Sequence, residues 1–153
     1  MEMEPKEVRV NLVGRSGSKT TGSVSFRPMG DAVHMTLEVR NAPPGLHAVH
    51  LHQKADCSSP DAKSAGDHWN PTREDHGRLG STPHAHRGDI GNLEVGKDGR
   101  GKLEFHAREW TIGGSEASNV LNHAIVVHAK ADDFRSQPAG NAGDRIACGE
   151  IRG

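Results

Sequence analysis

Hydrophobic and polar residues alternate along much of this chain. The clearest case is the run from residue 33 to residue 39, in which the apolar side chains are Val33, Met35, Leu37 and Val39. Successive side chains of a β-strand point to opposite faces of the sheet, so this alternation predicts a strand with one buried face. Similar or strongly apolar runs predict further strands at Val8–Leu12, Val24–Phe26, Ala48–His52, Gly91–Val95, Leu103–Phe105, His123–His128 and Arg145–Ile151.

Turn-forming residues separate these runs. The 153 residues include 19 Gly and 8 Pro, many of them between the runs, as at 14–17, 41–45 and 96–99. Many short strands with turns between them predict an all-β fold, an antiparallel sandwich or barrel with Greek-key connections. Without repeats or a linker, we expect one domain over residues 1–153. No segment shows a clear helical period, and residues 110–120 are open between a short strand and a loop.

Two long segments lack the alternation. Residues 55–86 are rich in Asp, Gly, Pro, Ser and His, and residues 130–144 form a second such segment. A structureless loop of about thirty residues in a compact domain is usually either functional or disordered. The histidines of the first segment are the candidates for holding it in place.

The charge and hydropathy of the chain argue against two classes of partner. The formal net charge is -1, so no overall basic field attracts nucleic acid or an anionic membrane. No apolar run approaches the roughly 18 residues that cross a bilayer. Residues 1–6 lack the apolar core of a signal peptide, which predicts either a cytosolic protein or one whose leader has been removed.

The two cysteines, Cys57 and Cys148, lie far apart in the sequence. They are either two unrelated buried thiols or one disulfide that closes a very long loop. In the second case the chain-entropy model gives a stabilisation on the order of 4 kcal/mol. A disulfide would also indicate an oxidising compartment.

Seven of the eleven histidines lie between His47 and His86. Within the predicted strand Ala48–His52, His50 and His52 point to one face while Val49 and Leu51 point to the other. Imidazole nitrogens suit copper and zinc, so this pair is half of a metal site. The alternative is a solvated surface rich in histidine. Further candidate ligands favour the metal site by their joint occurrence: His68, His76, His84, His86, Asp89 and His128.

The chain resembles the copper/zinc superoxide dismutases, in particular the bacterial ones. The resemblance covers almost the whole sequence and is carried by His50–His52, Asp56–Cys57, Gly66–Pro71, His86–Asn92, Val127–Asp133 and Gly140–Gly149. It implies an eight-stranded Greek-key antiparallel barrel with two long functional loops. It also implies the disproportionation of superoxide to oxygen and hydrogen peroxide by a copper ion that cycles between Cu(II) and Cu(I).

The same resemblance implies a role for each site residue. The implied copper ligands are His50, His52, His68 and His128, and the implied zinc ligands are His68, His76, His86 and Asp89. His68 would bridge the two metals as an imidazolate and store a proton for the peroxide product. Asp132 would accept hydrogen bonds from one histidine of each metal site, and Arg145 would attract the superoxide anion. Cys57 and Cys148 would form the disulfide.

These residue types suit that chemistry. Imidazoles tolerate both oxidation states of copper, whereas hard carboxylates do not. Zinc has no redox chemistry and accepts a tetrahedral set of three histidines and one carboxylate. The reaction approaches the diffusion limit, so the permanent local charge of Arg145 matters more than the net charge of the chain.

The remaining histidines receive weaker predictions. His47 precedes the paired histidines on the opposite strand face and resembles a structural, hydrogen-bonding histidine. His84 competes with His86 by spacing, and His86 is preferred because it keeps the order of the family motif with Asp89. We expect His34 to be solvated on the polar face of its strand, and His106 and His123 to lie at the surface or to be satisfied by hydrogen bonds.

Several positions depart from the usual family pattern: Ala48–Val49, Gln53, Ala55, Asn122–His123 and Asp144. Ala55 replaces a usual glycine, so a positive φ there would be strained. Asp144 lies directly before Arg145 and could pair with it or weaken its attraction for superoxide. Asp144→Ser is therefore predicted to raise the catalytic efficiency at low salt.

Two other functions compete with the enzyme. One is a copper-delivery or metal-buffering module, although such relatives usually lack copper ligands or the arginine. The other is a zinc-only structural domain, in which His128→Ala would change nothing. The disulfide favours the periplasm or the cell exterior, with the cytoplasm as the alternative, and the resemblance allows either a monomer or a homodimer.

Overall fold

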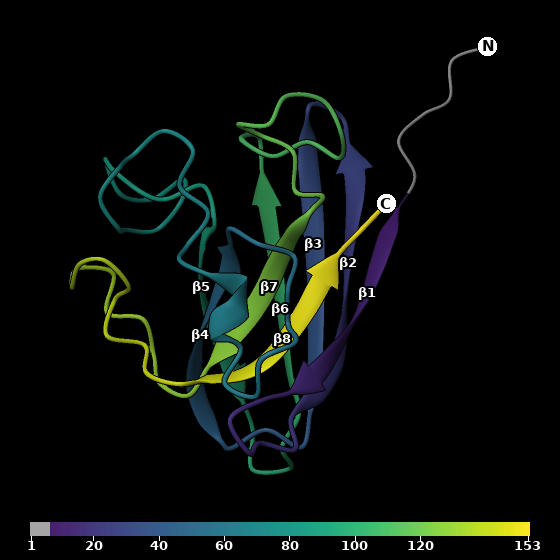
Figure 1. The fold of residues 1–153 in the computed structure, drawn as a ribbon, viewed down its shortest axis with the longest axis vertical. Coiled ribbons are helices and arrows are strands. Elements are labelled where there is room, and N and C mark those ends of the chain that lie inside the picture. Colours follow the sequence, from purple (N-terminus) through teal and green to yellow (C-terminus); the bar gives the residue numbers. More distant parts are fainter. Residues whose placement is uncertain (1–6) are drawn as a thin grey trace.

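The chain folds into eight strands and one short 3-10 helix in the computed structural model, which describes residues 7–153 (Figure 1). The elements are β1 Val8–Gly14, β2 Thr21–Met29, β3 Ala32–Arg40, β4 Gly45–His52, η1 Lys63–Ala65, β5 Asp89–Val95, β6 Gly101–Ala107, β7 His123–His128 and β8 Arg145–Ile151. Each of the eight predicted runs therefore contains or lies within one strand. Within residues 7–153, no helix has the length and hydropathy needed to span a membrane.

The strands close into a barrel in the order β1-β2-β3-β6-β5-β4-β7-β8, and neighbouring strands are antiparallel. The connections from β3 to β4 and from β6 to β7 skip over neighbours, which is the Greek-key pattern. The prediction of an eight-stranded Greek-key antiparallel barrel is confirmed.

The alternating side chains of the strands fill the barrel interior. Phe26, Met35 and Leu37 are fully buried there, and Trp110 stands beside Phe26 with ring centroids 5.9 Å apart. Residues 110–120, which the sequence left open, form a loop with one isolated bridge between Thr111 and Asn119.

β7 is buried on both faces, which explains its continuous apolar run. Ile125 and Val127 belong to the barrel core, whereas Ala124 and Val126 belong to a second, smaller cluster. This outer cluster also contains the two cysteines together with Ala62 and Ala65. The segment that follows β4 therefore covers the outer face of β7.

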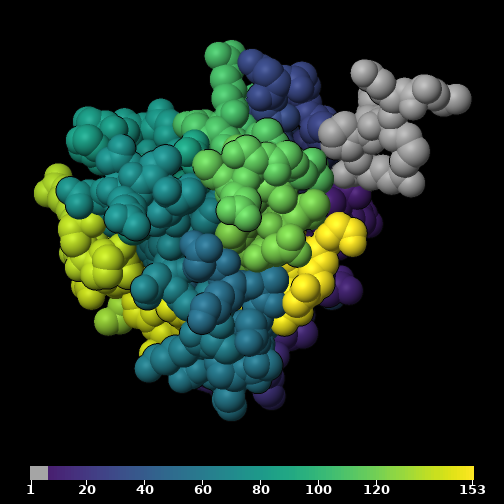
Figure 2. All heavy atoms as spheres, turned by 45° about the horizontal axis from the view of Figure 1, so that its top comes forward, coloured from purple at the N-terminus to yellow at the C-terminus, as the bar shows by residue number. Residues whose placement is uncertain are grey.

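Two long loops lie together on one side of the barrel. The first long loop, residues 53–88, joins β4 to β5, and the second long loop, residues 129–144, joins β7 to β8. They are drawn in teal and yellow-green beside β4 and β5 (Figure 1), and their surfaces adjoin in the space-filling view (Figure 2). A disulfide between Cys57 and Cys148 fastens the first long loop to β8, so the predicted pairing is confirmed.

Candidate metal centre

The neighbouring antiparallel strands β4 and β7 bring three histidines together. β4 pairs with β7, and His50 and His52 on β4 and His128 at the end of β7 are all buried. Nε2 of His128 lies 3.0 Å from Nδ1 of His50 and 3.3 Å from Nε2 of His52. The same-face placement of His50 and His52 thus gives two of three converging ring nitrogens.

The other nitrogen of each of these rings faces an acceptor outside the cluster. Nδ1 of His52 lies 2.7 Å from the carbonyl oxygen of Gly66, and Nδ1 of His128 lies 3.3 Å from that of Gly143. Nε2 of His50 lies 2.7 Å from Oδ2 of Asp132. Carbonyl and carboxylate oxygens only accept, so each ring donates its N–H outward. The three converging nitrogens therefore carry lone pairs, and a cation between them removes their mutual repulsion.

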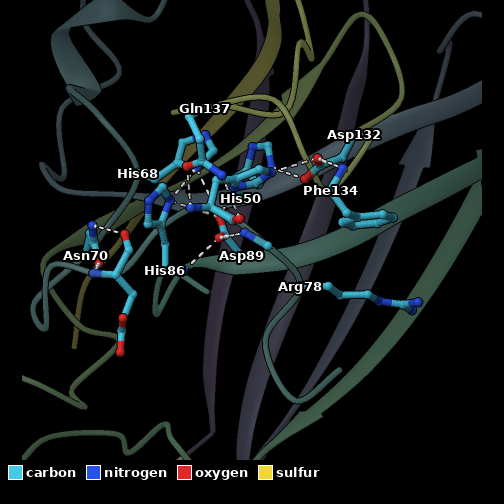
Figure 3. A network of polar contacts seen from close by, with 12 residues as sticks. His50, His68, Asn70, Arg78, His86, Asp89, Asp132, Phe134 and Gln137 are labelled. Atoms are coloured by element: carbon cyan, nitrogen blue, oxygen red, sulfur yellow. Dashed lines mark hydrogen bonds and ion pairs between the residues drawn. The ribbon is translucent and has the colours of Figure 1, made fainter. Parts of the chain in front are cut away.

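A second cluster forms where the first long loop meets the start of β5. Oδ1 of Asp89 lies 2.9 Å from Nδ1 of His76, 3.0 Å from Nδ1 of His68 and 3.3 Å from Nδ1 of His86. The Nδ1 atoms of His68 and His86 are 3.1 Å apart. Figure 3 shows His68 and His86 of the first long loop converging with Asp89 of β5.

The spacing of the second cluster fits zinc. For zinc–ligand bonds of about 2.0 Å, the edges of a ligand tetrahedron are about 3.3 Å. The measured separations of 2.9 to 3.3 Å lie close to that value. Nδ1 of His76 is buried with no hydrogen-bond partner within the described residues, although Asp89 is close by. Close contact without a hydrogen bond is the arrangement of atoms that share a metal ion.

His68 belongs to both clusters. Its Nδ1 faces the second cluster, and its Nε2 is buried without a hydrogen-bond partner in the part of the chain that the structure describes. The ligand atoms of His50, His52, His68 and His128 lie within 4.8 Å of one another, as do those of His50, His68, His76 and Asp89. Residues 7–153 thus contain two adjacent groups that suit a metal ion, and His68 and His50 are common to them.

Asp132 links the two clusters by accepting hydrogen bonds on the sides of the His50 and His76 rings that face away from the clustered nitrogens. Its Oδ2 accepts a hydrogen bond from Nε2 of His50, and its Oδ1 accepts one from Nε2 of His76 at 2.7 Å. Gly140, with a φ of 72°, lies against this carboxylate. A Cβ atom at residue 140 would stand 2.0 Å from Oδ1 of Asp132, so only glycine fits at this position.

Burial and neighbouring charges separate the pKa values of the clustered groups. Burial lowers the pKa of His50 and His52, and their neighbouring histidines lower it further. Burial also lowers the pKa of His128 to about 3. Burial acts in the same direction on His76, but its hydrogen bond to Asp132 and the nearby carboxylate of Asp89 outweigh that effect and raise its pKa to about 9. At neutral pH the three converging nitrogens of the first cluster are therefore unprotonated and available to a metal.

A cavity of about 570 Å³ leads to the first cluster. His52, His68 and His128 line it, together with Arg145 and Asp67. Arg145 is half-buried, and its Nη1 donates a hydrogen bond to the carbonyl oxygen of Ala62 at 3.0 Å. The cavity thus presents a permanent positive charge beside the histidines.

Comparison with known proteins agrees with a centre that binds two metal ions. The family model described as copper/zinc superoxide dismutase (SODC) matches residues 20–151. Cu-Zn superoxide dismutases of Caulobacter vibrioides and Deinococcus radiodurans are 37% and 36% identical to the chain; the matches cover 92% and 93% of it and 83% and 82% of those relatives.

Among solved structures, a SOD-like protein from Bacillus subtilis aligns with a TM-score of 0.85 and 33% identity. The alignment covers 95% of this chain and 97% of that one. That structure is of a double mutant in which a tyrosine and a proline are replaced by histidine.

The chain belongs to the copper/zinc superoxide dismutase family.

The structure describes the conformation or the surroundings of three positions that depart from the usual family pattern. Asn122 has a φ of 67°, and asparagine tolerates this left-handed conformation better than most residues. Among the described residues Ala55 does not have a positive φ, so the strain that such a conformation would cause does not arise there. The alanine with a positive φ is Ala62, at 60°. Asp144 is exposed, and among residues 7–153 no ion pair joins it to Arg145.

The other histidines of this family member lie outside both clusters. His47 is buried, with its two ring nitrogens 2.9 and 2.6 Å from the carbonyl oxygens of His128 and Pro43. His84 is exposed and pairs with Glu74. His123 is buried; its Nδ1 donates to the carbonyl oxygen of Gln53, and its ring stacks on Trp69.

His34 and His106 face each other across β3 and β6, His34 half-buried near Glu104 and His106 exposed. Neither Asn92 nor Gln137 was predicted to have a role, although the side-chain amide of each hydrogen-bonds the backbone of a residue at the metal centre. The family motifs contain Asn92, but nothing in the local pattern marks Gln137.

Proposed function

We propose that the chain disproportionates superoxide with copper bound by one cluster and zinc bound by the other. The proposed copper ligands are His50, His52, His68 and His128, and the proposed zinc ligands are His68, His76, His86 and Asp89. The observation that carries the proposal is the convergence of ring nitrogens whose N–H groups all point to acceptors outside the cluster. Bound copper supplies one-electron redox chemistry, and bound zinc supplies a fixed charge without redox activity.

Arg145 binds the substrate anion. Its guanidinium stays charged at any physiological pH and offers several N–H donors to an oxygen anion. The hydrogen bond to Ala62 holds one end of the guanidinium, and the cavity places the residue beside His52 and His128. Superoxide that enters the cavity is therefore drawn toward the first cluster.

His68 is the residue of the chain that handles the proton. Its Nε2 is buried and has no hydrogen-bond partner within the described residues, while Asp89 and His86 hold Nδ1 on the opposite side. We assign to this Nε2 one of the two protons that the peroxide product takes up; the nitrogen would carry it only while it is not bound to copper. Asp132 keeps the neighbouring His50 in the tautomer whose Nδ1 carries the lone pair.

The experiment that tests the function measures metal content and superoxide dismutation on the same purified protein. The unaltered chain is expected to retain one copper and one zinc through dialysis and to be active. His128→Ala removes one copper ligand and is expected to lower activity by at least about a hundredfold while leaving zinc bound. His84→Ala, an exposed histidine outside both clusters, is the matched control and is expected to change neither property.

The same measurements separate the competing functions. A copper-loaded chain without activity would contradict the enzyme and favour a metal-buffering or copper-delivery module. A His128→Ala protein with unchanged copper content and activity would favour the zinc-only structural domain. The complete histidine set and Arg145 support the enzyme over both.

We also propose that the protein works in the periplasm or outside the cell. The disulfide between Cys57 and Cys148 supports this, because such bonds persist in oxidising compartments. Fractionation of the native cells tests it, and recovery in the cytoplasm would favour the alternative. The resemblance allows a monomer or a homodimer, and light scattering against the chain mass of 16.4 kDa distinguishes the two.

A further inference from the structure

Two side-chain amides hold the two ends of the His76–Asp132 hydrogen bond. Oδ1 of Asn92 accepts from the Asp132 N–H at 2.7 Å, and Nδ2 of Asn92 donates to the Asp132 carbonyl at 3.1 Å. Gln137 does the same for His76: Oε1 accepts from the His76 N–H at 2.6 Å, and Nε2 donates to the His76 carbonyl at 3.0 Å. Asn92 lies on β5, but Gln137 belongs to the second long loop and reaches across to the first (Figure 3).

The amide of Gln137 fits in only one orientation. Its Nε2 also donates to the carbonyl of Arg135 at 3.1 Å, so the nitrogen faces two acceptors while the oxygen faces a donor. A carboxylate of the same shape would place an oxygen against both carbonyls. Gln137 is exposed, so these hydrogen bonds, rather than burial of the side chain, hold it in place.

A second contact between the two loops lies beside Asp132. The Arg78 guanidinium carbon lies 5.5 Å from the centre of the Phe134 ring, and the Phe134 N–H donates to Oδ1 of Asp132. Pro138 and Ala139, directly after Gln137, line the cavity that leads to the first cluster. The position of Gln137 therefore affects both His76 and one wall of the cavity.

We propose that Gln137 is a positioning residue of the metal centre, whose amide fastens the second long loop to the backbone of His76 and so fixes the Nδ1 of that ring toward Asp89. This inference rests on the proposed function, because it takes His76 as a zinc ligand. Without the amide, the His76 backbone loses two hydrogen bonds to a residue 61 positions away in sequence, while the polar contacts of the ring with Asp132 and Asp89 remain.

The test uses the full chain, stripped of metal and loaded with zinc alone or with Co²⁺ alone. Gln137→Glu keeps the shape of the side chain but replaces the donor, and Gln137→Ala removes both hydrogen bonds. Each is expected to raise the zinc dissociation constant by about tenfold in a chelator competition, the low end of what loss of a partner behind a metal ligand costs. Each is also expected to change the visible absorption of bound Co²⁺, which reports the ligand geometry.

Ser136→Ala is the matched control. Ser136 is also exposed, but its hydroxyl bonds Asp133 within the same loop. It is expected to leave zinc affinity and the Co²⁺ spectrum unchanged. A Gln137→Glu protein with the zinc affinity and the Co²⁺ spectrum of the unaltered chain would overturn the role of Gln137 while the proposed zinc site stands. An unaltered chain that binds no zinc would overturn both.

Discussion

At the scale of single residues, the charge beside Arg145 comes from the first long loop rather than from its sequence neighbour. Burial lowers the pKa of Arg145, while the charges of Asp67 and Asp61 act in the opposite direction. Asp67 lines the cavity together with Arg145, whereas Asp144 is exposed and lies outside the cavity lining. We therefore expect a larger electrostatic effect on Arg145 from Asp67 than from Asp144.

Replacing Asp67 with asparagine is predicted to raise catalytic efficiency. The change removes a negative charge from the cavity that superoxide enters, and we expect a gain on the order of twofold at low ionic strength. Salt screens exposed charges, so the gain should disappear near 0.2 M salt, where the Debye length is below about 8 Å. Stopped-flow measurement of superoxide decay checks both points.

Asp144→Ser is the comparison variant. Its effect at low ionic strength should be smaller than that of Asp67→Asn. A lower rate for Asp67→Asn, or a larger gain for Asp144→Ser, would return the role to the neighbour of Arg145.

The residue types were accessible from the sequence, but their orientations were not. Strand alternation was enough to place His50 and His52 on one face. The direction of each ring N–H depends on Gly66, Gly143 and Asp132, which reach the site from two separate loops. Gln137 escaped notice for the same reason, since its partner is 61 residues away.

At the scale of elements, the disulfide holds the first long loop in the position in which the Ala62 carbonyl accepts a hydrogen bond from Arg145. Cys57 and Ala62 belong to the same outer cluster, and Ala62 is the residue whose carbonyl accepts from Arg145. The disulfide joins that segment to Cys148 on β8, three residues after Arg145. The bond therefore orders the loop and the guanidinium together.

Removing the disulfide is predicted to lower both stability and activity. The cysteines are 91 residues apart, for which chain entropy gives a loss of about 4 kcal/mol in the free energy of unfolding. Equilibrium denaturation of a Cys57→Ser, Cys148→Ser double variant measures it. Activity should fall more than copper content, because Arg145 loses a fixed partner while three of the four copper ligands, His50, His52 and His128, stay on β4 and β7. Equal losses of copper and activity would show that the bond acts on the metal centre itself.

The alternation of apolar and polar residues predicted the strands of the barrel. It did not predict the conformation of the loops, which depends on contacts between residues far apart in the sequence. The alternation over residues 33–39 corresponds to β3, whose apolar side chains enter the core. Periodicity gave no conformation for the two long loops, because their shape follows from the histidine clusters, the disulfide and the Gln137 amide. Residues 110–120 are a loop for a similar reason: Trp110 enters the core and donates to the carbonyl of Arg87.

At the scale of the whole molecule, the metal-free chain should lose stability in mild acid. The folded pKa of His128 is about 3, below the ordinary value of 6.5, and those of His50 and His52 are also lowered. Below pH 6.5 the unfolded chain takes up protons at these residues and the folded chain does not, so the free energy of unfolding falls.

Burial also lowers the pKa of His68 and of His123, so both act in the same direction, whereas His76 and Asp89 add little pH dependence in this range. His76, whose folded pKa is raised to about 9, contributes stability that is complete below pH 6.5 and is lost only as pH rises toward 9. Asp89, with a lowered pKa, loses its contribution only below its ordinary value of 3.8. Denaturation of the metal-free protein near pH 6.5 and near pH 4 checks the prediction. His128→Gln should flatten the dependence, and a stability that does not change between these pH values would contradict it.

The proposed metal centre requires the His68 ring to lie between two different metal ions. Crystals of the oxidised protein loaded with copper and zinc, measured on both sides of each absorption edge, test it most directly. Two separate anomalous peaks are predicted, a copper peak touching His50, His52, His68 and His128 and a zinc peak touching His68, His76, His86 and Asp89. A single peak, or a His68 ring in contact with only one of two metals, would contradict the account.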